Sequence, residues 1–335
     1  MNDEIVVINE SDVQSSVPIV NVLMITYEHE KFIAEAIEGV VSQYGKFKLR
    51  LFIGEDSGKD KTRDICEEYA RKYPEKITLL PSDKNYGIQE NFIRVLKQCL
   101  DSDYFAVCEG DDKWVDSAKI KNQIEFLEAH QNYVAHAHNV IRRNLISGED
   151  SFFGKEYSGR CDFDEVFNGW PFHAVSMMVR SEVLRPIPLD NLPYFISADR
   201  FLNRWIVCNG QFYYDGVKSM AVYHRHESGA SQNSNLLDLR YQENNMLNFL
   251  KEYIPKKDIS SFWRAKKHIL QDIALFVARG YGKKKHNYYI LLEYIYITRL
   301  TRINNFYFSC LMLFGRQFYD FHRHCKKLKS WGQSN

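Results

Sequence analysis

Tyr104-Phe-Ala-Val-Cys-Glu-Gly-Asp-Asp112 is the stretch of sequence that decides the fold. Its first part, Tyr104 to Cys108, is a run of apolar residues typical of a strand that is covered on both faces. The carboxylates of Glu109, Asp111 and Asp112 follow directly, and such closely spaced charges repel one another unless a cation compensates them. Oxygen ligands of this kind favour Mg²⁺ or Mn²⁺. A solvated acidic turn is the alternative interpretation of these residues taken alone.

The chain around this stretch alternates between short apolar runs and segments with helical periodicity. We expect strands over 19–26, 49–53, 77–80 and 104–108, with helices over 32–41, 60–73 and 87–100. Strands that alternate with helices predict an α/β fold whose central sheet is mostly parallel and flanked by helices. In such sheets ligands bind at the carboxyl ends of the strands, so Asp56 and Asp111 should lie at one edge.

The second half of the chain gives weaker signals. Further strands are expected over 133–138, 173–179, 211–215 and 219–226, with a helix over 198–208 and helices from about 236 to the end. We therefore divide the chain into a polar leader (1–17), a main domain (18–255) and a helical tail (256–335).

Charge separates the tail from the main domain. The 335 residues carry 44 Lys and Arg against 43 Asp and Glu, and 45% of them are hydrophobic, which excludes a disordered chain. Residues 256–335 hold 16 basic and 4 acidic residues, a charge of +12, whereas residues 1–255 hold 28 basic and 39 acidic residues, a charge of −11. Aromatic residues are interleaved with the basic ones in the tail. This pattern suits an anionic membrane surface, and helices that pack on the main domain are the alternative.

The cysteines, the N-terminal residues and the apolar runs of the sequence indicate where in the cell the protein is located. None of the seven cysteines forms a CxxC pair, which favours reduced thiols. The acidic N-terminal residues do not resemble a signal peptide, and no uncharged apolar run reaches the length of about 20 residues that a transmembrane helix needs. We expect a cytoplasmic protein that binds peripherally to the inner face of the membrane. A tail that binds RNA is a weaker alternative, because no nucleic-acid-binding motif accompanies it, and we expect no nucleic acid partner.

Several other polar residues have a plain structural explanation when each is taken alone. Asp199 could cap a helix, Asn85 and Gly87 could form a turn, and His226 could be a structural hydrogen-bonder. Their order along the chain is more informative. Over residues 18–230 the sequence resembles the family 2 glycosyltransferases, which have the GT-A fold. The matching segments are Val20–Tyr27, Glu55–Thr62, Asn85–Gly87, Tyr104–Trp114, Gln123–Leu127, Ser197–Asp199 and Tyr223–His226.

The resemblance implies a nucleotide-sugar site. Thr26 and Asp56 would contact the base or ribose, Asn85 and Gly87 would belong to the same donor-binding set, and Asp111 would face the ribose or the metal. The donor would be a nucleotide-diphosphate sugar, with a UDP-sugar first among the candidates.

The resemblance also implies the catalytic parts. Asp112 would bind the divalent cation, Mn²⁺ or Mg²⁺, that bridges the diphosphate, with His226 as a further ligand. Asp199 would be the base that takes the proton from the acceptor hydroxyl. This single base implies a displacement with inversion, in which a hexosyl or N-acetylhexosaminyl group moves to a glycan or lipid-linked acceptor in bacterial cell-surface polysaccharide synthesis.

Four positions depart from the family pattern. Glu28 stands at the usual Asn and would lie beside the donor, and Gly58 replaces the usual Ser. Ala198 replaces the Glu before the base. His224 replaces the usual Arg, which makes the adjacent Arg225 a candidate donor contact. These changes concern the phosphate contacts, and they leave open a non-catalytic relative as an alternative. A nucleotidyltransferase would need a Gly-rich loop after the first strand, and that loop is missing.

Overall fold

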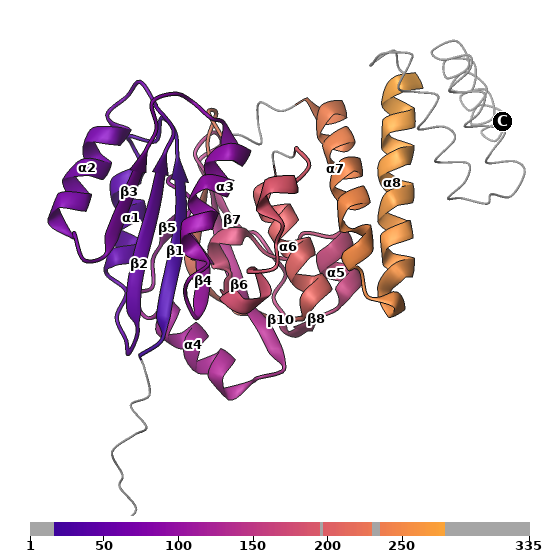
Figure 1. Ribbon diagram of the computed structural model, residues 1–335, viewed down its shortest axis with the longest axis horizontal. Coiled ribbons are helices and arrows are strands. Elements are labelled where there is room, and N and C mark those ends of the chain that lie inside the picture. Colours follow the sequence, from indigo (N-terminus) through magenta and orange to yellow (C-terminus); the bar gives the residue numbers. More distant parts are fainter. Residues whose placement is uncertain (1–16, 195–196, 230–234, 279–335) are drawn as a thin grey trace, which may run out of the picture.

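The computed structural model describes residues 17–194, 197–229 and 235–278. At its centre lies a mixed sheet with helices on both faces (Figure 1). Its spatial strand order is β3-β2-β1-β4-β9-β6-β10-β5. The predicted α/β fold with a mostly parallel central sheet is confirmed in the first half, where β3, β2, β1 and β4 are all parallel. The elements of this half are β1 (Ile19–Thr26), α1 (Ile33–Val41), β2 (Lys48–Glu55), α2 (Thr62–Lys72), β3 (Ile77–Pro81), α3 (Ile88–Cys99) and β4 (Tyr104–Val107).

The strand β1 shows why a parallel sheet appears in the sequence as a continuous apolar run. Val20, Val22 and Met24 pack into the core on one face, under α1, whereas Leu23 packs into the core on the other face, under α3. Both faces are covered, so residues of either parity must be apolar.

The second half adds strands of mixed direction to the same sheet. β9 lies antiparallel between β4 and β6, and β10 is parallel to β6 and antiparallel to β5. The main elements are β5 (Lys113–Trp114), α4 (Lys119–Ala129), β6 (Tyr133–Asn144), β7 (Glu149–Phe152), β8 (Ser158–Cys161), α5 (Phe163–Asn168), η1 (Ala174–Ser176), β9 (Met178–Arg180), η2 (Ser181–Val183), η3 (Leu189–Asn191), α6 (Ala198–Asn209) and β10 (Gln211–Arg225).

Two expectations for this half need correction. The strand predicted over 173–179 is mostly a 3₁₀ turn, η1, and only Met178–Arg180 forms a strand. The two strands predicted over 211–215 and 219–226 are a single strand, β10. Shifts in its register with β6, between Asp215 and Val222, explain why the periodicity breaks there.

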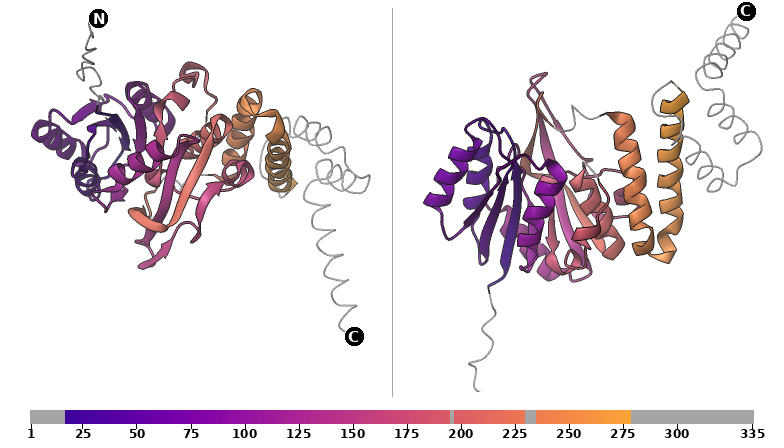
Figure 2. Two further views of the ribbon diagram at one scale, coloured as in Figure 1. Left: turned by 90° about the horizontal axis from the view of Figure 1, so that it is seen from below. Right: turned by 45° about the horizontal axis from the view of Figure 1, so that its top comes forward.

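Two helices, α7 (Leu236–Leu250) and α8 (Ile259–Ala278), close the described part of the chain. They lie side by side at the end of the molecule farthest from α2 (Figures 1 and 2). Phe262 and Leu270 of α8 are fully buried in the core that also holds α3 and α6. The predicted division at residue 255 stays a prediction, because residues 279–335 and the leader up to residue 16 lie outside the described residues. Among the helices that are described, none has the length and apolar character needed to span a membrane.

Candidate active site

A cavity of about 580 Å³ opens at the carboxyl ends of β1 and β4. Seven of the residues predicted from the sequence line it: Thr26, Asp56, Asn85, Gly87, Asp111, Asp199 and His226. Topology explains this meeting, because β1, β2 and β4 are parallel neighbours whose carboxyl ends lie at one edge. Glu28, Asp112 and Arg225, also predicted as site residues, are not among the residues that line the cavity.

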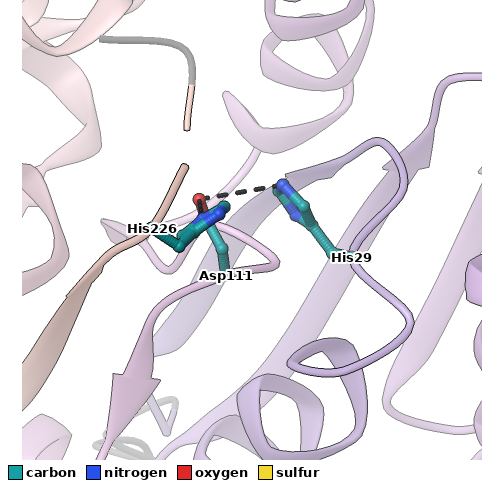
Figure 3. A group of neighbouring side chains, drawn as sticks. All are labelled: His29, Asp111 and His226. Atoms are coloured by element: carbon teal, nitrogen blue, oxygen red, sulfur yellow. Dashed lines mark hydrogen bonds and ion pairs between the residues drawn. The ribbon is translucent and has the colours of Figure 1, made fainter. Parts of the chain in front are cut away.

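Three side chains from three distant segments converge on one point of the cavity wall (Figure 3). His226 Nε2 lies 3.0 Å from Asp111 Oδ2, and His29 Nε2 lies 3.7 Å from the same oxygen. One ligand atom from each residue falls within 4.8 Å of the others. Two imidazoles and one carboxylate at this spacing are a donor set that fits a divalent cation.

The two histidines are held in different ways. His226 is oriented by its other ring nitrogen, since Nδ1 lies 2.8 Å from the hydroxyl of Ser228. His29 is oriented through its backbone: its N–H donates to Thr62 Oγ1 at 2.8 Å, and its carbonyl accepts from the N–H groups of Phe32 and Ile33, where α1 begins. Glu28, just before it, turns the chain with φ of 54°. The ring of Phe32 lies 4.9 Å from that of His226 and 6.5 Å from that of His29.

The charged groups in and around the cluster shift one another's pKa values. Burial lowers the pKa of His29, although Asp111 opposes this shift. Burial alone would raise the pKa of Asp111, but the neighbouring His29 and His226 outweigh it and hold this pKa below its ordinary value. Burial, together with Asp111 and Asp199, raises the pKa of Glu109 to about 8. The carboxylate next to the histidines is therefore the ionised one.

Asp112, the next residue after Asp111, belongs neither to this cluster nor to the residues that line the cavity. Its Oδ1 accepts a 3.4 Å hydrogen bond from the backbone N–H of His224, and its Oδ2 lies 3.6 Å from His173 Nδ1 without a hydrogen bond from any described residue. Burial, reinforced by Asp111 and Glu109, raises its pKa well above the ordinary value. Of the two aspartates, only Asp111 belongs to the cluster and lines the cavity.

The carboxylate of Asp56 forms hydrogen bonds within the protein. Its two carboxylate oxygens accept 2.8 Å hydrogen bonds from the backbone N–H groups of Tyr86 and Gly87. Asn85 Oδ1 also accepts from Gly87, whose φ of 80° requires a glycine in this turn. Asp56 thus fixes the loop over 85–87 that forms one wall of the cavity.

Gly110 allows a close approach between two strand ends. A Cβ at this position would lie 2.5 Å from Thr26 Oγ1 and 2.7 Å from Thr26 Cβ, so a side chain here would force Thr26 or the turn to shift. The hydroxyl of Thr26 is itself buried and lacks a hydrogen-bond partner among the described residues. A buried polar atom without a partner is costly unless a ligand satisfies it.

The opposite wall comes from α6 and α7. Asp199 lies in the first turn of α6, where burial raises its pKa. Next to it, Arg200 pairs at 2.9 Å with Glu243 of α7, and its guanidinium lies 5.7 Å from the ring centre of Trp170. Leu239 of α7 lines the cavity near them. The sequence predicts Asp199 in this wall, but it gives no sign of its other residues, which belong to no shared motif: Trp170, Arg200, Leu239 and Glu243.

His29, His173 and Glu109 were also missed as site residues. Of these, only Glu109 gave a signal, as the first acid of the run after β4. The position of His29 depends on the backbone turn at Glu28, which the sequence does not reveal.

Comparisons with known proteins agree with this geometry. Residues 21–179 match the model for "Glycosyl transferase family 2". The chain is 34% identical to the dTDP-rhamnosyl transferase RfbG of Shigella flexneri over 38% of its own length and 46% of that protein. It is 33% identical to the uncharacterized protein Rv1520 of Mycobacterium tuberculosis over 36% of its length, and the match spans about a third (34%) of that relative.

A solved structure extends the likeness beyond the matched segment. Residues 1–349 of S. aureus TarS, in complex with UDP-GlcNAc, superpose with a TM-score of 0.54 at 15% identity, covering 84% of this chain and 89% of that one. At this identity the likeness concerns the fold, which is the GT-A fold expected from the sequence.

Proposed function

We propose that the chain, whose residues 21–179 match the model for glycosyl transferase family 2, is an inverting glycosyltransferase. It moves a sugar from a nucleotide-diphosphate sugar to a hydroxyl group of a glycan or lipid-linked acceptor. The observation that carries this proposal is the meeting of Asp111, His226 and Asp199 around one cavity.

Asp111 and His226 are the residues that would hold a divalent cation. When bound, such a cation supplies positive charge that stabilises the departing nucleoside diphosphate. The geometry favours Asp111 over Asp112 for this role, because only Asp111 lies beside His226 and lines the cavity. Asp112 instead positions the turn through the backbone of His224.

Asp199 is the proposed general base. It lines the cavity from the first turn of α6, and burial raises its pKa toward the range in which a carboxylate accepts a proton more readily. It takes the proton of the acceptor hydroxyl as that oxygen attacks the anomeric carbon. Since one base acts on one face, the product has the inverted configuration.

The donor side lies along the ends of β1 and β2. Thr26 Oγ1 needs a hydrogen-bond partner that a ribose or base could provide, and the loop fixed by Asp56 borders the same space. TarS binds UDP-GlcNAc on a related fold, which supports a UDP-sugar as the first donor to test. The name of RfbG makes a dTDP-sugar the second.

The acceptor side is the wall of α6 and α7. Trp170, 41% exposed, offers an aromatic face of the kind on which sugar rings stack, and Arg200 holds a charge beside it. Leu239 makes part of this wall apolar. A mixture of aromatic, charged and apolar surface suits a sugar that is attached to a lipid or a polymer, as in cell-surface polysaccharide synthesis.

A donor screen tests the proposal. The full chain is mixed with Mn²⁺ and UDP-, GDP- or dTDP-sugars, and thermal stabilisation and release of the nucleotide are measured. We expect one nucleotide class to raise the melting temperature and to be turned over by the wild type. Asp199→Asn should keep the stabilisation and lose turnover. If no nucleotide sugar stabilises the protein or is turned over, the proposal is wrong.

A further inference from the structure

We propose that His29 is a third protein ligand of the cation, and that the set His29, Asp111 and His226 selects a first-row transition ion such as Mn²⁺ over Mg²⁺. The inference rests on the proposed function only for the purpose of the cation. The three side chains alone define the binding site.

The distances suit a shared ion. Ligand atoms that bind one transition ion at about 2.0–2.2 Å lie roughly 3–3.6 Å from one another. Asp111 Oδ2 lies 3.0 Å from His226 Nε2 and 3.7 Å from His29 Nε2. All three ligand atoms fall within 4.8 Å of one another, so the two histidine nitrogens would have to approach each other by roughly 1–2 Å to share one ion.

Contacts within the protein hold the side chains of the cluster in place. Both backbone groups of His29 are engaged, its N–H with Thr62 and its carbonyl with the start of α1. His226 is fixed through Ser228, which leaves Nε2 as the ring nitrogen that faces Asp111. Phe32 packs near both imidazoles and limits their rotation. Groups that orient ligands in this way raise the affinity of a metal site.

The ligand types decide the preference. Mg²⁺ is a hard cation that keeps several waters and binds mainly through carboxylates and phosphates. Imidazole nitrogens suit transition ions better, and two histidines with one carboxylate form a face that leaves the other positions open. A site with Asp111 and a single histidine would discriminate less. His29 is thus the residue on which the selectivity depends.

Direct binding of the metal to the chelator-treated full chain, without nucleotide, is the test. Mn²⁺ is followed by electron paramagnetic resonance and Co²⁺ by its visible absorption, each in competition with Mg²⁺. For the wild type we expect Mn²⁺ to bind at least about 10-fold more tightly than Mg²⁺. His29→Ala should weaken Mn²⁺ binding by at least about 10–100-fold, because losing a ligand should cost no less than losing a group that orients one, and it should change Mg²⁺ binding less.

Two further variants sharpen the result. His29→Asp supplies an oxygen ligand and should shift the preference back toward Mg²⁺; it is also the variant to measure if His29→Ala does not fold. His130→Ala removes an exposed histidine that belongs neither to the cluster nor to the cavity lining, and this variant should bind both ions as the wild type does.

The outcomes separate this inference from the proposed function. An unchanged Mn²⁺ to Mg²⁺ ratio in both His29 variants overturns the inference, even if they bind nucleotide less tightly and sugar transfer is confirmed. A changed ratio supports it, even if the donor screen finds no substrate and the proposed function fails.

Discussion

His226 Nε2 lies 3.0 Å from Asp111 Oδ2, although 115 residues separate them along the chain. The two-residue strand β5 explains this contact. It follows Asp112 directly and pairs with β10 in the register Val222 with Lys113, which brings the turn after β4 beside the end of β10. Trp114 anchors β5, since its ring N–H donates a 2.9 Å hydrogen bond to the carbonyl of Val175.

The two aspartates of the turn should behave differently when mutated. Asp111→Asn removes the charge that faces both histidines, so we expect Mn²⁺ affinity and sugar transfer to fall by about 100-fold or more. Asp112→Asn keeps an acceptor for the N–H of His224, so its Mn²⁺ affinity should stay within a few-fold of the wild type. Calorimetric titration of both variants with Mn²⁺ checks this. The reverse order of effects would restore Asp112 as the ligand.

The proposed base gives a pH dependence. Asp199 must be ionised to accept a proton, and burial raises its pKa above the ordinary value for an aspartate, about 3.9. The transfer rate should therefore fall as the pH drops through this raised pKa. Asp199→Asn should reduce the rate by about 10²–10⁴-fold, the usual contribution of a general base, and abolish this acidic limb. Transfer rates of the wild type and of Asp199→Asn, measured between about pH 4 and 9, test this pH dependence. If Asp199→Asn retains the full rate, Asp199 is not the base.

The α6–α7 wall should govern the acceptor alone. Trp170→Ala removes an exposed aromatic face and should raise the KM for the acceptor several-fold, while the KM for the donor changes little. Arg185→Ala is a matched control, because Arg185 contacts the carbonyls of Leu100 and Ser102 and does not line the cavity. Steady-state kinetics with each substrate varied in turn give the answer. Equal effects on both substrates would show that this wall does not bind the acceptor.

The membrane role predicted for the basic tail can be tested without disturbing the core. A chain that ends at Ala278 keeps α8, whereas a chain that ends at Pro255 loses the buried Phe262 and Leu270. We expect the chain that ends at Ala278 to keep a melting temperature near that of the full chain, and the chain that ends at Pro255 to be strongly destabilised. In flotation with anionic liposomes, the full chain should bind and the chain ending at Ala278 should bind less. Equal binding by both would contradict membrane attachment through residues 279–335.

The sequence was sufficient to predict the parallel half of the sheet and the edge that holds the site, because both depend on local patterns. Residues of β1 had to be apolar on both faces, and parallel strands had to end together, so Asp56 and Asp111 could be placed at one edge. The sequence could not say which of two consecutive aspartates faces the cavity, because that depends on the geometry of the turn. It also gave no sign of His29, whose position follows from the backbone turn at Glu28.

The remaining part of the site depends on long-range packing. Arg200 and Glu243 meet because α7 lies against α6, Trp170 reaches Arg200 from the segment after α5, and none of the three belongs to a motif. Asp56 illustrates the opposite case: its position was predictable, but its engagement with the N–H groups of Tyr86 and Gly87 became apparent only from the structure.

The stereochemistry of transfer tests the central claim most directly. Once the donor screen has identified a nucleotide sugar, the anomeric configuration of the new linkage is determined by NMR and compared with that of the donor. With Asp199 acting as a single base in the cavity that Asp111 and His226 also line, the product should have the inverted configuration, and Asp199→Asn should yield almost none of it. A product with retained configuration, or full transfer by Asp199→Asn, would contradict the account.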